Sequence, residues 1–260
     1  MSDEFFLRNR GTHAVVTGGG QGLGLAIAKR LAREGAPSIV LAGRDKAKGE
    51  AAAAEVRGLG AECIFVAADV ATAEDCVRLI ETAIARFGTV NGLVNAAATS
   101  ARGSLLDTTL AMWDDHMNTN VRGPFLLMQG MVRHLVDTGA PGSIVNILSQ
   151  SAYAGQPFLT PYSTSKGALA VLTKNVANAF ASNCIRCNGL MPGWMDTPGE
   201  TAVQQRFHGA GPDWLAEAEA AQPMGQLVKP DQAASLVAYM ISPESGVMTG
   251  ALVDYDQKVA

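Results

Sequence analysis

Apolar positions along the chain follow two alternating periods. Seven short runs are apolar almost throughout and predict buried strands at residues 13–17, 38–42, 63–67, 92–95, 143–148, 183–188 and 252–254. The segments between them are longer and repeat apolar side chains every three or four positions, which predicts helices, for example over 23–34, 46–59 and 73–87. Strands without a polar face, each followed by a helix, indicate a parallel sheet covered on both faces. We therefore expect an α/β fold with one doubly wound parallel sheet of about seven strands.

One stretch, residues 194–228, departs from this alternation. It holds no strand-like run, yet it contains Trp194, His208 and Trp214, and residues 209–212 read Gly-Ala-Gly-Pro, a hinge-like sequence. Long aromatic loops in compact α/β domains are commonly lids or binding loops. Because no linker, repeat or low-complexity tract interrupts the rest, we predict a single domain over residues 1–260 with a substrate lid at 194–228.

Composition and charge narrow the class of partner. Hydrophobic residues make up 48% of the chain and charged ones 17%, which is ample material for a large core. The net charge of −4 offers no basic surface for nucleic acid or anionic lipid, and no apolar run is long enough to suggest a membrane span. The 4 cysteines are too few for a disulfide scaffold, and residues 1–10 lack the pattern of a signal peptide. These features favour a cytoplasmic protein that binds a small molecule.

Two cysteines and the histidines are the candidate metal ligands. Cys184 and Cys187 form a C-x2-C pair inside the predicted strand 183–188, where positions three apart face opposite sides. A zinc site would need both thiols on one side and a second pair, and the four histidines show no metal spacing. We therefore interpret these residues as structural and predict no metal site.

Glycine is the residue type in clearest excess, at 28 of 260 residues. Residues 17–24 read Thr-Gly-Gly-Gly-Gln-Gly-Leu-Gly, directly after the first predicted strand and before a helix. At such a junction, glycines let the backbone approach a pyrophosphate, and the helix N-terminus favours an anion. The position between strand and helix indicates a dinucleotide site; a tight turn that simply needs glycine is the alternative.

The end of the second strand indicates which nicotinamide cofactor binds. An acidic residue there would bind the adenosine 2′-hydroxyl, whereas a cation would accept a 2′-phosphate. The chain places Gly43 at the strand tip and Arg44 next to it, and an arginine fork can hold a phosphate through two hydrogen bonds. The residues favour NADP(H) over NAD(H). Arg44 as a solvated surface residue is the alternative, and Asp45 beside it could reverse the preference.

Three residues carry the elements of proton-transfer chemistry. Ser149 follows the run 143–148, which puts its hydroxyl at the carboxyl end of a strand, where open α/β sheets bind ligands. Tyr162 and Lys166 lie four positions apart in a predicted helix over 160–180, so their side chains share one face. A lysine cation about 4–5 Å from the phenol would lower its pKa enough for work near neutral pH. An ordinary surface pair is the alternative interpretation of the Tyr-x-x-x-Lys spacing alone.

Together and in this order, the motifs resemble those of the short-chain dehydrogenase/reductase family, over nearly the whole chain. The resemblance implies a Rossmann-type fold and catalytic roles for Ser149, Tyr162 and Lys166, with Asn120 holding a water in a proton relay. It also implies that Asp69 and Val70 bind adenine. The cofactor contacts predicted from the motifs and the resemblance together are Thr17, Gly18, Gly20, Gln21, Gly22, Leu23, Gly24, Gly43, Arg44, Asp69, Val70, Asn95, Ala96, Ala97, Tyr162, Lys166, Pro192, Gly193 and Thr197.

Several positions depart from the family pattern. Ala97 stands where glycine is usual, and Gln21 where some NADP-specific members carry a basic residue, so only Arg44 argues for the phosphate. Ser151 is a rival to Ser149, but the thirteen-residue interval to Tyr162 favours Ser149. Residues 253–258 read Val-Asp-Tyr-Asp-Gln-Lys in place of the usual Val-Asp-Gly-Gly ending, and the sequence gives this tail no role.

The predicted activity is hydride transfer between a nicotinamide cofactor and a secondary alcohol or ketone. Ser151, Tyr153 and Trp194 are candidate substrate contacts, and the mixture of Trp with charged residues in the lid favours a small polar alcohol, sugar or polyol. A 3-oxoacyl thioester reductase is the alternative enzyme, and an NADP(H)-sensing regulatory protein is the alternative without turnover. The resemblance further implies a homotetramer formed through long helices at about 110–136 and 160–180.

Overall fold

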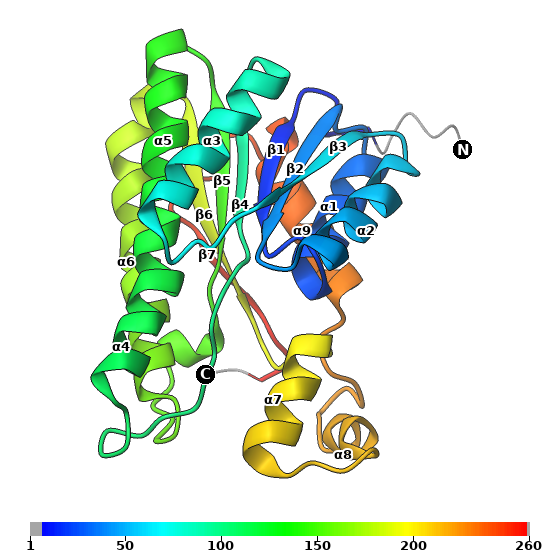
Figure 1. Cartoon of the computed structure of the whole chain (residues 1–260), viewed down its shortest axis with the longest axis vertical. Coiled ribbons are helices and arrows are strands. Elements are labelled where there is room, and N and C mark those ends of the chain that lie inside the picture. The colour runs from blue at the N-terminus through cyan, green and yellow to red at the C-terminus, as the bar shows by residue number, and fades with distance from the viewer. Residues whose placement is uncertain (1–6, 259–260) are drawn as a thin grey trace.

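The computed structural model describes residues 7–258 and contains one parallel sheet of seven strands in the order β3-β2-β1-β4-β5-β6-β7 (Figure 1). Each strand lies where an apolar run predicted it, so the doubly wound α/β fold is confirmed. The strands are β1 (His13–Thr17), β2 (Ser38–Gly43), β3 (Glu62–Ala67), β4 (Gly92–Asn95), β5 (Gly142–Ile147), β6 (Ile185–Pro192) and β7 (Leu252–Tyr255).

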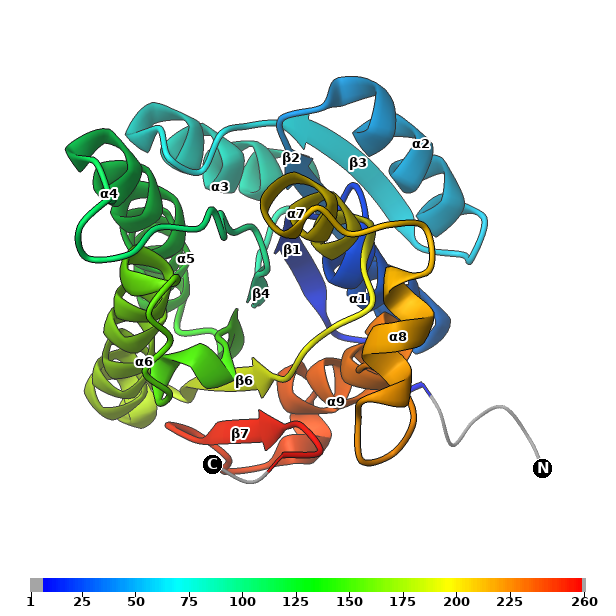
Figure 2. The same cartoon turned by 90° about the horizontal axis from the view of Figure 1, so that it is seen from below.

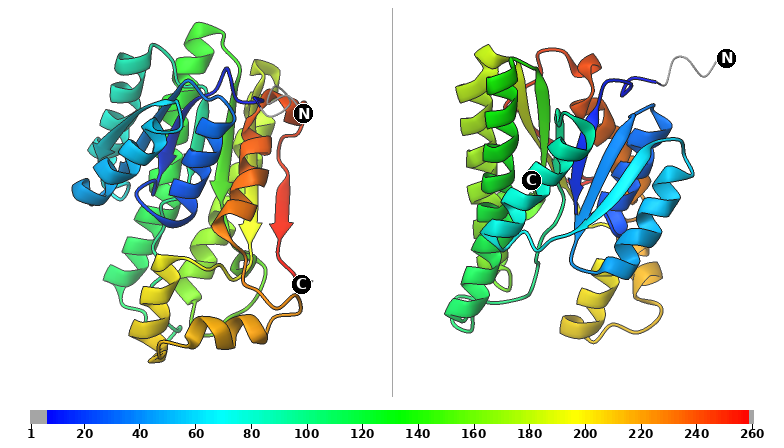
Figure 3. Two further views of the ribbon diagram at one scale, coloured as in Figure 1. Left: turned by 90° about the vertical axis from the view of Figure 1, so that its right-hand side faces the viewer. Right: turned by 45° about the horizontal axis from the view of Figure 1, so that its top comes forward.

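Helices cover both faces of the sheet, as Figures 1 and 3 show. One face carries α1 (Gly22–Arg33), α2 (Lys46–Arg57) and α9 (Pro230–Ile241). The other carries α3 (Ala73–Phe87), α5 (Gly123–Thr138) and α6 (Thr160–Phe180). No helix within residues 7–258 has the length and apolar composition needed to cross a membrane.

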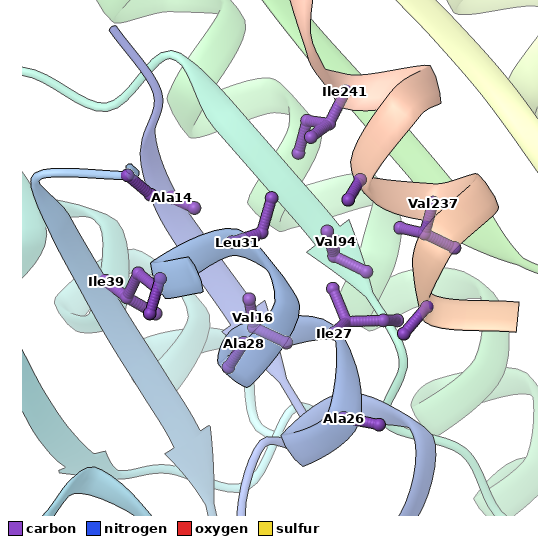
Figure 4. Close-up of a cluster of buried hydrophobic side chains, with 14 of the residues drawn as sticks. Ala14, Val16, Ala26, Ile27, Ala28, Leu31, Ile39, Val94, Val237 and Ile241 are labelled. Atoms are coloured by element: carbon purple, nitrogen blue, oxygen red, sulfur yellow. The ribbon is translucent and has the colours of Figure 1, made fainter. Parts of the chain in front are cut away.

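The two hydrophobic cores explain why the strands are apolar throughout. Along β1, Val16 faces the core under α1 and α9, whereas Val15 faces the core under α3 and α5. Successive strand side chains point to opposite faces, so a strand buried on both sides has no face of solvent-exposed polar residues. Figure 4 shows the first core, in which Ile27 of α1 and Val237 of α9 pack over the central strands.

The long helix expected at about 110–136 is interrupted. It consists of α4 (Leu110–Met117), one π-helical turn (Asn118–Arg122) and α5. Pro124 occupies the start of α5. A proline inside a helix has no N–H to donate and clashes with the carbonyl four residues earlier, which accounts for the local widening. The turn carries Asn120 and sets the direction of its side chain.

The structure corrects two other sequence expectations. The segment 194–228 is not a long loop, because it forms α7 (Pro198–His208) and α8 (Trp214–Ala220), which project beyond the sheet in Figure 1. Its two ends are joined by a bridge between Met195 and Val228. Cys184 lies outside β6, exposed and at a φ of 57°, whereas Cys187 is buried in the strand.

Candidate active site

A cavity of about 1000 Å³ lies at the carboxyl ends of the strands, between the sheet and helix α7 of the 194–228 segment. Figure 2 views the molecule from this end. Parallel strands direct their loops to one edge, and the edge between β1 and β4, where the chain order reverses, is the usual ligand position in doubly wound sheets. The predicted site residues that line the cavity are Gly18, Gly20, Gln21, Gly22, Leu23, Gly24, Gly43, Arg44, Asp69, Val70, Ala96, Ala97, Ser149, Ser151, Tyr162, Lys166, Pro192, Gly193, Trp194 and Thr197.

The glycine turn after β1 is shaped by backbone constraints at two positions. Gly18 has a φ of 66°, a conformation that glycine adopts without strain. At Gly24 a Cβ atom would overlap the carbonyl of Gly18, so α1 can begin this close to β1 only without a side chain there. The side chain of Gln21 caps no N–H of α1. The N-terminus of the helix therefore presents N–H donors toward the cavity.

The far end of the cavity is formed by the tip of β2 and the start of α2. Arg44 and Lys48 both line it, and both are exposed. The carboxylate of Asp45 accepts the N–H of Lys48 at 3.0 Å and thereby caps α2. Lys48 was not identified from the sequence as a cofactor contact. Its place in the first turn of α2, four positions after Arg44, could have indicated that both cations face the same ligand.

Two predicted cofactor residues lie behind the cavity wall. Thr17 is buried, and its hydroxyl oxygen accepts the N–H groups of Ala96 and Ala97, each at 3.1 Å. Asn95 is also buried, and its amide donates to Asn146 at 2.8 Å. Thr17 thus fixes the backbone after β4 and Asn95 links β4 to β5, and neither side chain lines the cavity.

Asn120 is also outside the cavity lining. Its side-chain oxygen accepts the N–H of Thr99 at 2.9 Å, and its amide donates to the Thr99 carbonyl at 2.9 Å and to the Ser165 hydroxyl at 3.0 Å. The Ser165 hydroxyl in turn donates to the carbonyl of Tyr162 at 2.7 Å. The amide therefore connects the loop after β4 to the first turn of α6, and the predicted water contact stays a prediction.

Ser149, Tyr162 and Lys166 converge on one wall of the cavity. Ser149 follows β5 and accepts the backbone N–H of Ser151 at 3.1 Å. Tyr162 and Lys166 lie one turn apart in α6, with the lysine Nζ 5.7 Å from the centre of the tyrosine ring. The same Nζ donates to the Ile147 carbonyl at 2.6 Å and is buried. Tyr153, a predicted substrate contact, does not line the cavity and is 56% exposed.

The protonation of Tyr162 differs from the sequence expectation. Burial raises its pKa above the ordinary value, while a hydrogen bond with Ser149 and the charge of Arg102 act in the opposite direction. Burial also lowers the pKa of Lys166 to about 8. We expected the lysine charge to depress the phenol pKa. In the protein alone the loss of hydration dominates, so the neutral phenol is the favoured form.

A polar cluster joins the loop after β4 to α7 above these residues. A guanidinium nitrogen of Arg102 lies 3.7 Å from the carboxylate of Glu200. The same carboxylate oxygen accepts the indole N–H of Trp194 at 2.8 Å and the amide of Gln204 at 2.7 Å. Arg102 also lies within 3.4 Å of His208. The predicted lid thus contributes charged and aromatic side chains to the cavity.

Two further residues in the cavity come from the C-terminal tail. Asp256 and Lys258 line it, beyond the end of β7. The sequence marked residues 253–258 as unusual but gave no means of placing them, because the position of the tail depends on the pairing of β7 with β6.

Comparison with known sequences gives one family over almost the whole chain. Residues 18–257 match the family model described as enoyl-(acyl carrier protein) reductase. Dehydrogenase/reductase SDR family member 4 of Bos taurus is 34% identical over 241 residues, which cover 92% of this chain and 84% of the relative. 2-(S)-Hydroxypropyl-CoM dehydrogenase 3 of Xanthobacter autotrophicus is 33% identical over 243 residues, 93% of each chain.

Solved structures agree with this result. A variant of actinorhodin polyketide ketoreductase solved with NADPH superposes with a TM-score of 0.89 at 28% identity, over 95% of this chain and 96% of the other. A xylitol dehydrogenase bound to NAD+ gives 0.87 at 27% identity, over 96% and 99%. The two neighbours hold different nicotinamide cofactors, so the likeness leaves the choice between them to the residues of this chain.

Proposed function

The chain belongs to the short-chain dehydrogenase/reductase family, and from that membership we propose that it transfers a hydride between NADP(H) and a secondary alcohol or ketone. One observation carries the proposal. Ser149, Tyr162 and Lys166 line the same cavity as the glycine turn after β1, so proton-transfer groups and a phosphate-binding loop share one space. We also propose that residues 1–260 form a single domain.

The residues that line the cavity offer contacts for the successive parts of a dinucleotide. N–H groups at the start of α1 can receive a pyrophosphate, and Asp69 and Val70 line the cavity near the tip of β2. Pro192, Gly193 and Thr197 also line the cavity, and the side chain of Thr197 lies next to Gly22 of the glycine turn. The bound nicotinamide would supply or accept the hydride. These positions support the predicted cofactor contacts of the loop, the strand tips and the segment after β6.

The residues of this chain would handle the proton. In reduction, the Tyr162 phenol donates its proton to the carbonyl oxygen as the hydride reaches the carbonyl carbon, and the reverse occurs in oxidation. Ser149 donates a hydrogen bond to the same oxygen and stabilises its developing negative charge. Burial favours the neutral phenol, which is the form that donates. By resemblance to the family, Lys166 would hold the cofactor ribose, and its charge would support the phenolate once it forms.

The catalytic assignment is tested by Tyr162→Phe, with Tyr153→Phe as the matched control. Loss of the phenolic proton should lower turnover by at least ~100-fold while the fold and cofactor binding persist. Tyr153 is exposed and outside the cavity, so its variant should keep full activity. Turnover is followed at 340 nm across a panel of alcohols and ketones. Full activity of Tyr162→Phe would refute the assignment, and Ser149→Ala compared with Ser151→Ala separates the two serines.

The preference for NADP(H) is supported by charge at the adenosine end of the cavity. Two cations, Arg44 and Lys48, line it, and the neighbouring Asp45 is engaged in capping α2. Arg44→Asp should weaken NADPH binding by about 10- to 100-fold and strengthen NADH binding, since a charge-assisted phosphate contact contributes about 1.5–3 kcal/mol. Lys46→Ala, at the start of α2 two residues after Arg44 but outside the cavity, is the control. Equal changes in both affinities would contradict this preference.

The substrate proposed first is a small polar alcohol, sugar or polyol. Ser151, Trp194 and the Arg102–Glu200 pair give the cavity polar groups that suit hydroxyls. A 3-oxoacyl thioester reductase is the second candidate, favoured by the acyl carrier protein reductase description of the matching family model. Assays with xylitol and with an acetoacetyl thioester separate the two. Nucleotide binding with no turnover on the whole panel would favour the NADP(H)-sensing protein instead.

We further propose a homotetramer in a reducing, cytoplasmic setting. An apolar groove between α5 and α6 includes Phe125 and Val136, which are 43% and 42% exposed, and a contact between copies would cover such a surface. All four cysteines are free, as a reducing compartment requires. Native mass, and its change in Phe125→Glu, tests the assembly.

A further inference from the structure

The C-terminal tail places a carboxylate in the substrate end of the cavity. Asp256 follows β7, which the left panel of Figure 3 shows running toward the end of the molecule that carries α7 and α8. It is half-buried and lines the cavity with Trp194 and Ser149. The position follows from the sheet, because Gly193 donates its N–H to the carbonyl of Tyr255 at 3.0 Å and so holds the tail beside the segment after β6.

The carboxylate and Gly193 fit one another closely. A Cβ atom at residue 193 would overlap the side chain of Asp256, so the acid occupies its position only because Gly193 has no side chain. One carboxylate oxygen also accepts the backbone N–H of Gln257 at 2.8 Å, which restricts the rotation of the group. The orientation of the acid is therefore fixed before any ligand binds.

The next residue ties the tail to the base of the 194–228 segment. The amide of Gln257 donates to the carbonyl of Gln226 at 2.6 Å, and its oxygen accepts the N–H of Met224 at 2.8 Å. These two bonds join positions more than thirty residues apart in sequence and hold Asp256 at the cavity wall. Gln257 is thus a positioning residue for the acid.

The Asp256 carboxylate differs from that of Glu200, another acid that lines the cavity. Glu200 already accepts two side-chain hydrogen bonds and lies 3.7 Å from Arg102. Within residues 7–258, no Lys, Arg or His nitrogen lies within 4.0 Å of the carboxylate of Asp256, although Lys258 lines the same cavity. The acid thus keeps acceptor capacity for a ligand. Acceptors of this kind bind hydroxyl or ammonium donors and repel carboxylates.

We propose that Asp256 is a specificity-determining residue that selects substrates carrying a second hydrogen-bond donor, a hydroxyl or an ammonium group, besides the reacting alcohol or ketone. The inference rests on the proposed oxidoreductase function and narrows its substrate class. It also disfavours substrates that end in a carboxylate, because the Asp256 carboxylate would repel that group and Arg102 already pairs with Glu200.

A length series of secondary alcohols tests the proposal. The compounds have four to six carbons and end in methyl, hydroxyl, ammonium or carboxylate, and kcat/KM is measured for each with NADP+. The wild-type protein should prefer hydroxyl and ammonium ends over methyl, and methyl over carboxylate. Asp256→Asn should reduce the ammonium-over-methyl preference at least about tenfold and relieve the carboxylate penalty by a similar factor. Gln257→Ala should shift both ratios in the same direction by a smaller factor.

Asp254→Asn is the matched control, since Asp254 lies two residues away on β7, is exposed and does not line the cavity. It should leave all ratios unchanged. Melting temperature and NADPH affinity are measured for every variant. The proposal would be overturned if Asp256→Asn changed kcat/KM by the same factor for all four end groups, or left kcat/KM unchanged.

Failure of the proposed function has a different signature. If no compound in the series turns over, binding of the ammonium-ended and methyl-ended alcohols is measured by calorimetry on the NADP+-loaded protein. A preference for the ammonium end that is lost in Asp256→Asn would keep the selective role of the acid while the oxidoreductase proposal fails. Equal binding, or no binding of either alcohol, would overturn the role of Asp256 itself.

Discussion

Lys166 should make the protein without cofactor less stable at neutral pH than a variant without the charge. The ammonium group is buried and donates to one carbonyl, that of Ile147, at 2.6 Å. Burial lowers its pKa from 10.5 to about 8. At about 1.4 kcal/mol per pH unit, that difference corresponds to at most roughly 3.5 kcal/mol of destabilisation when the group is charged.

The sign of the pH dependence follows from the depressed pKa. Between pH 10.5 and about 8 the unfolded chain holds this proton and the folded protein does not. The free energy of unfolding should therefore rise as pH rises through this window, and the full destabilisation is present below about pH 8. Lys166→Met removes the charge and keeps most of the side-chain length. It also leaves the Ile147 carbonyl without its donor, at a cost of about 1 kcal/mol.

The expected result is a Lys166→Met protein about 2 kcal/mol more stable than wild type at pH 7, with the difference shrinking toward pH 10. Urea denaturation without cofactor at several pH values measures it. Lys174→Met, on the exposed side of the same helix, is the control and should change stability by less than about 0.5 kcal/mol. Identical pH slopes in wild type and Lys166→Met would refute the reasoning. Lys166→Met should also lower turnover, although it stabilises the fold, because it removes the ammonium group that the proposed chemistry needs.

Two further substitutions test packing, one at a buried ion pair away from the site and one in the glycine turn. Glu34→Gln should lower the free energy of unfolding by at least about 3 kcal/mol in urea denaturation, because buried Glu34 pairs with Arg8 at 2.8 Å and with Arg30 at 2.5 Å. Glu55→Gln, in an exposed pair, should lower it by under about 1 kcal/mol. Equal losses in the two variants would contradict the argument from burial. Gly24→Ala should lower the melting temperature and NADPH affinity, because its Cβ would overlap the backbone of the glycine turn; an unchanged melting temperature would show that the turn can move aside.

Much of the fold could be predicted because each strand is buried on both faces. A run such as 143–148 needs no tertiary information to be recognised, since it is mostly apolar and every position in it is buried. The catalytic candidates share this local character. Ser149 follows a strand, and Tyr162 and Lys166 are one helical turn apart, so spacing alone brings the last two to one face.

The segment 194–228 shows where such reasoning stops. No residue of α7 is buried and α8 spans only seven residues, so the periodic signal that revealed α1 or α3 is weak there. The π-helical turn at Asn120 was missed for another reason. The widening of the turn before Pro124 depends on backbone geometry, which the spacing of hydrophobic residues does not reveal.

The sequence by itself determined the succession of strands and helices along the chain and the residues with the chemistry for proton transfer, because these depend on spacings of a few residues. The end of the sheet at which the cavity lies followed from the parallel arrangement that this succession implies. Only the tertiary structure decided what those residues touch. The bond of Lys166 to Ile147, the capping role of Asp45 and the contact of Asp256 with Gly193 all depend on how elements pack. The last contact joins residues more than sixty positions apart, a separation that no local pattern encodes.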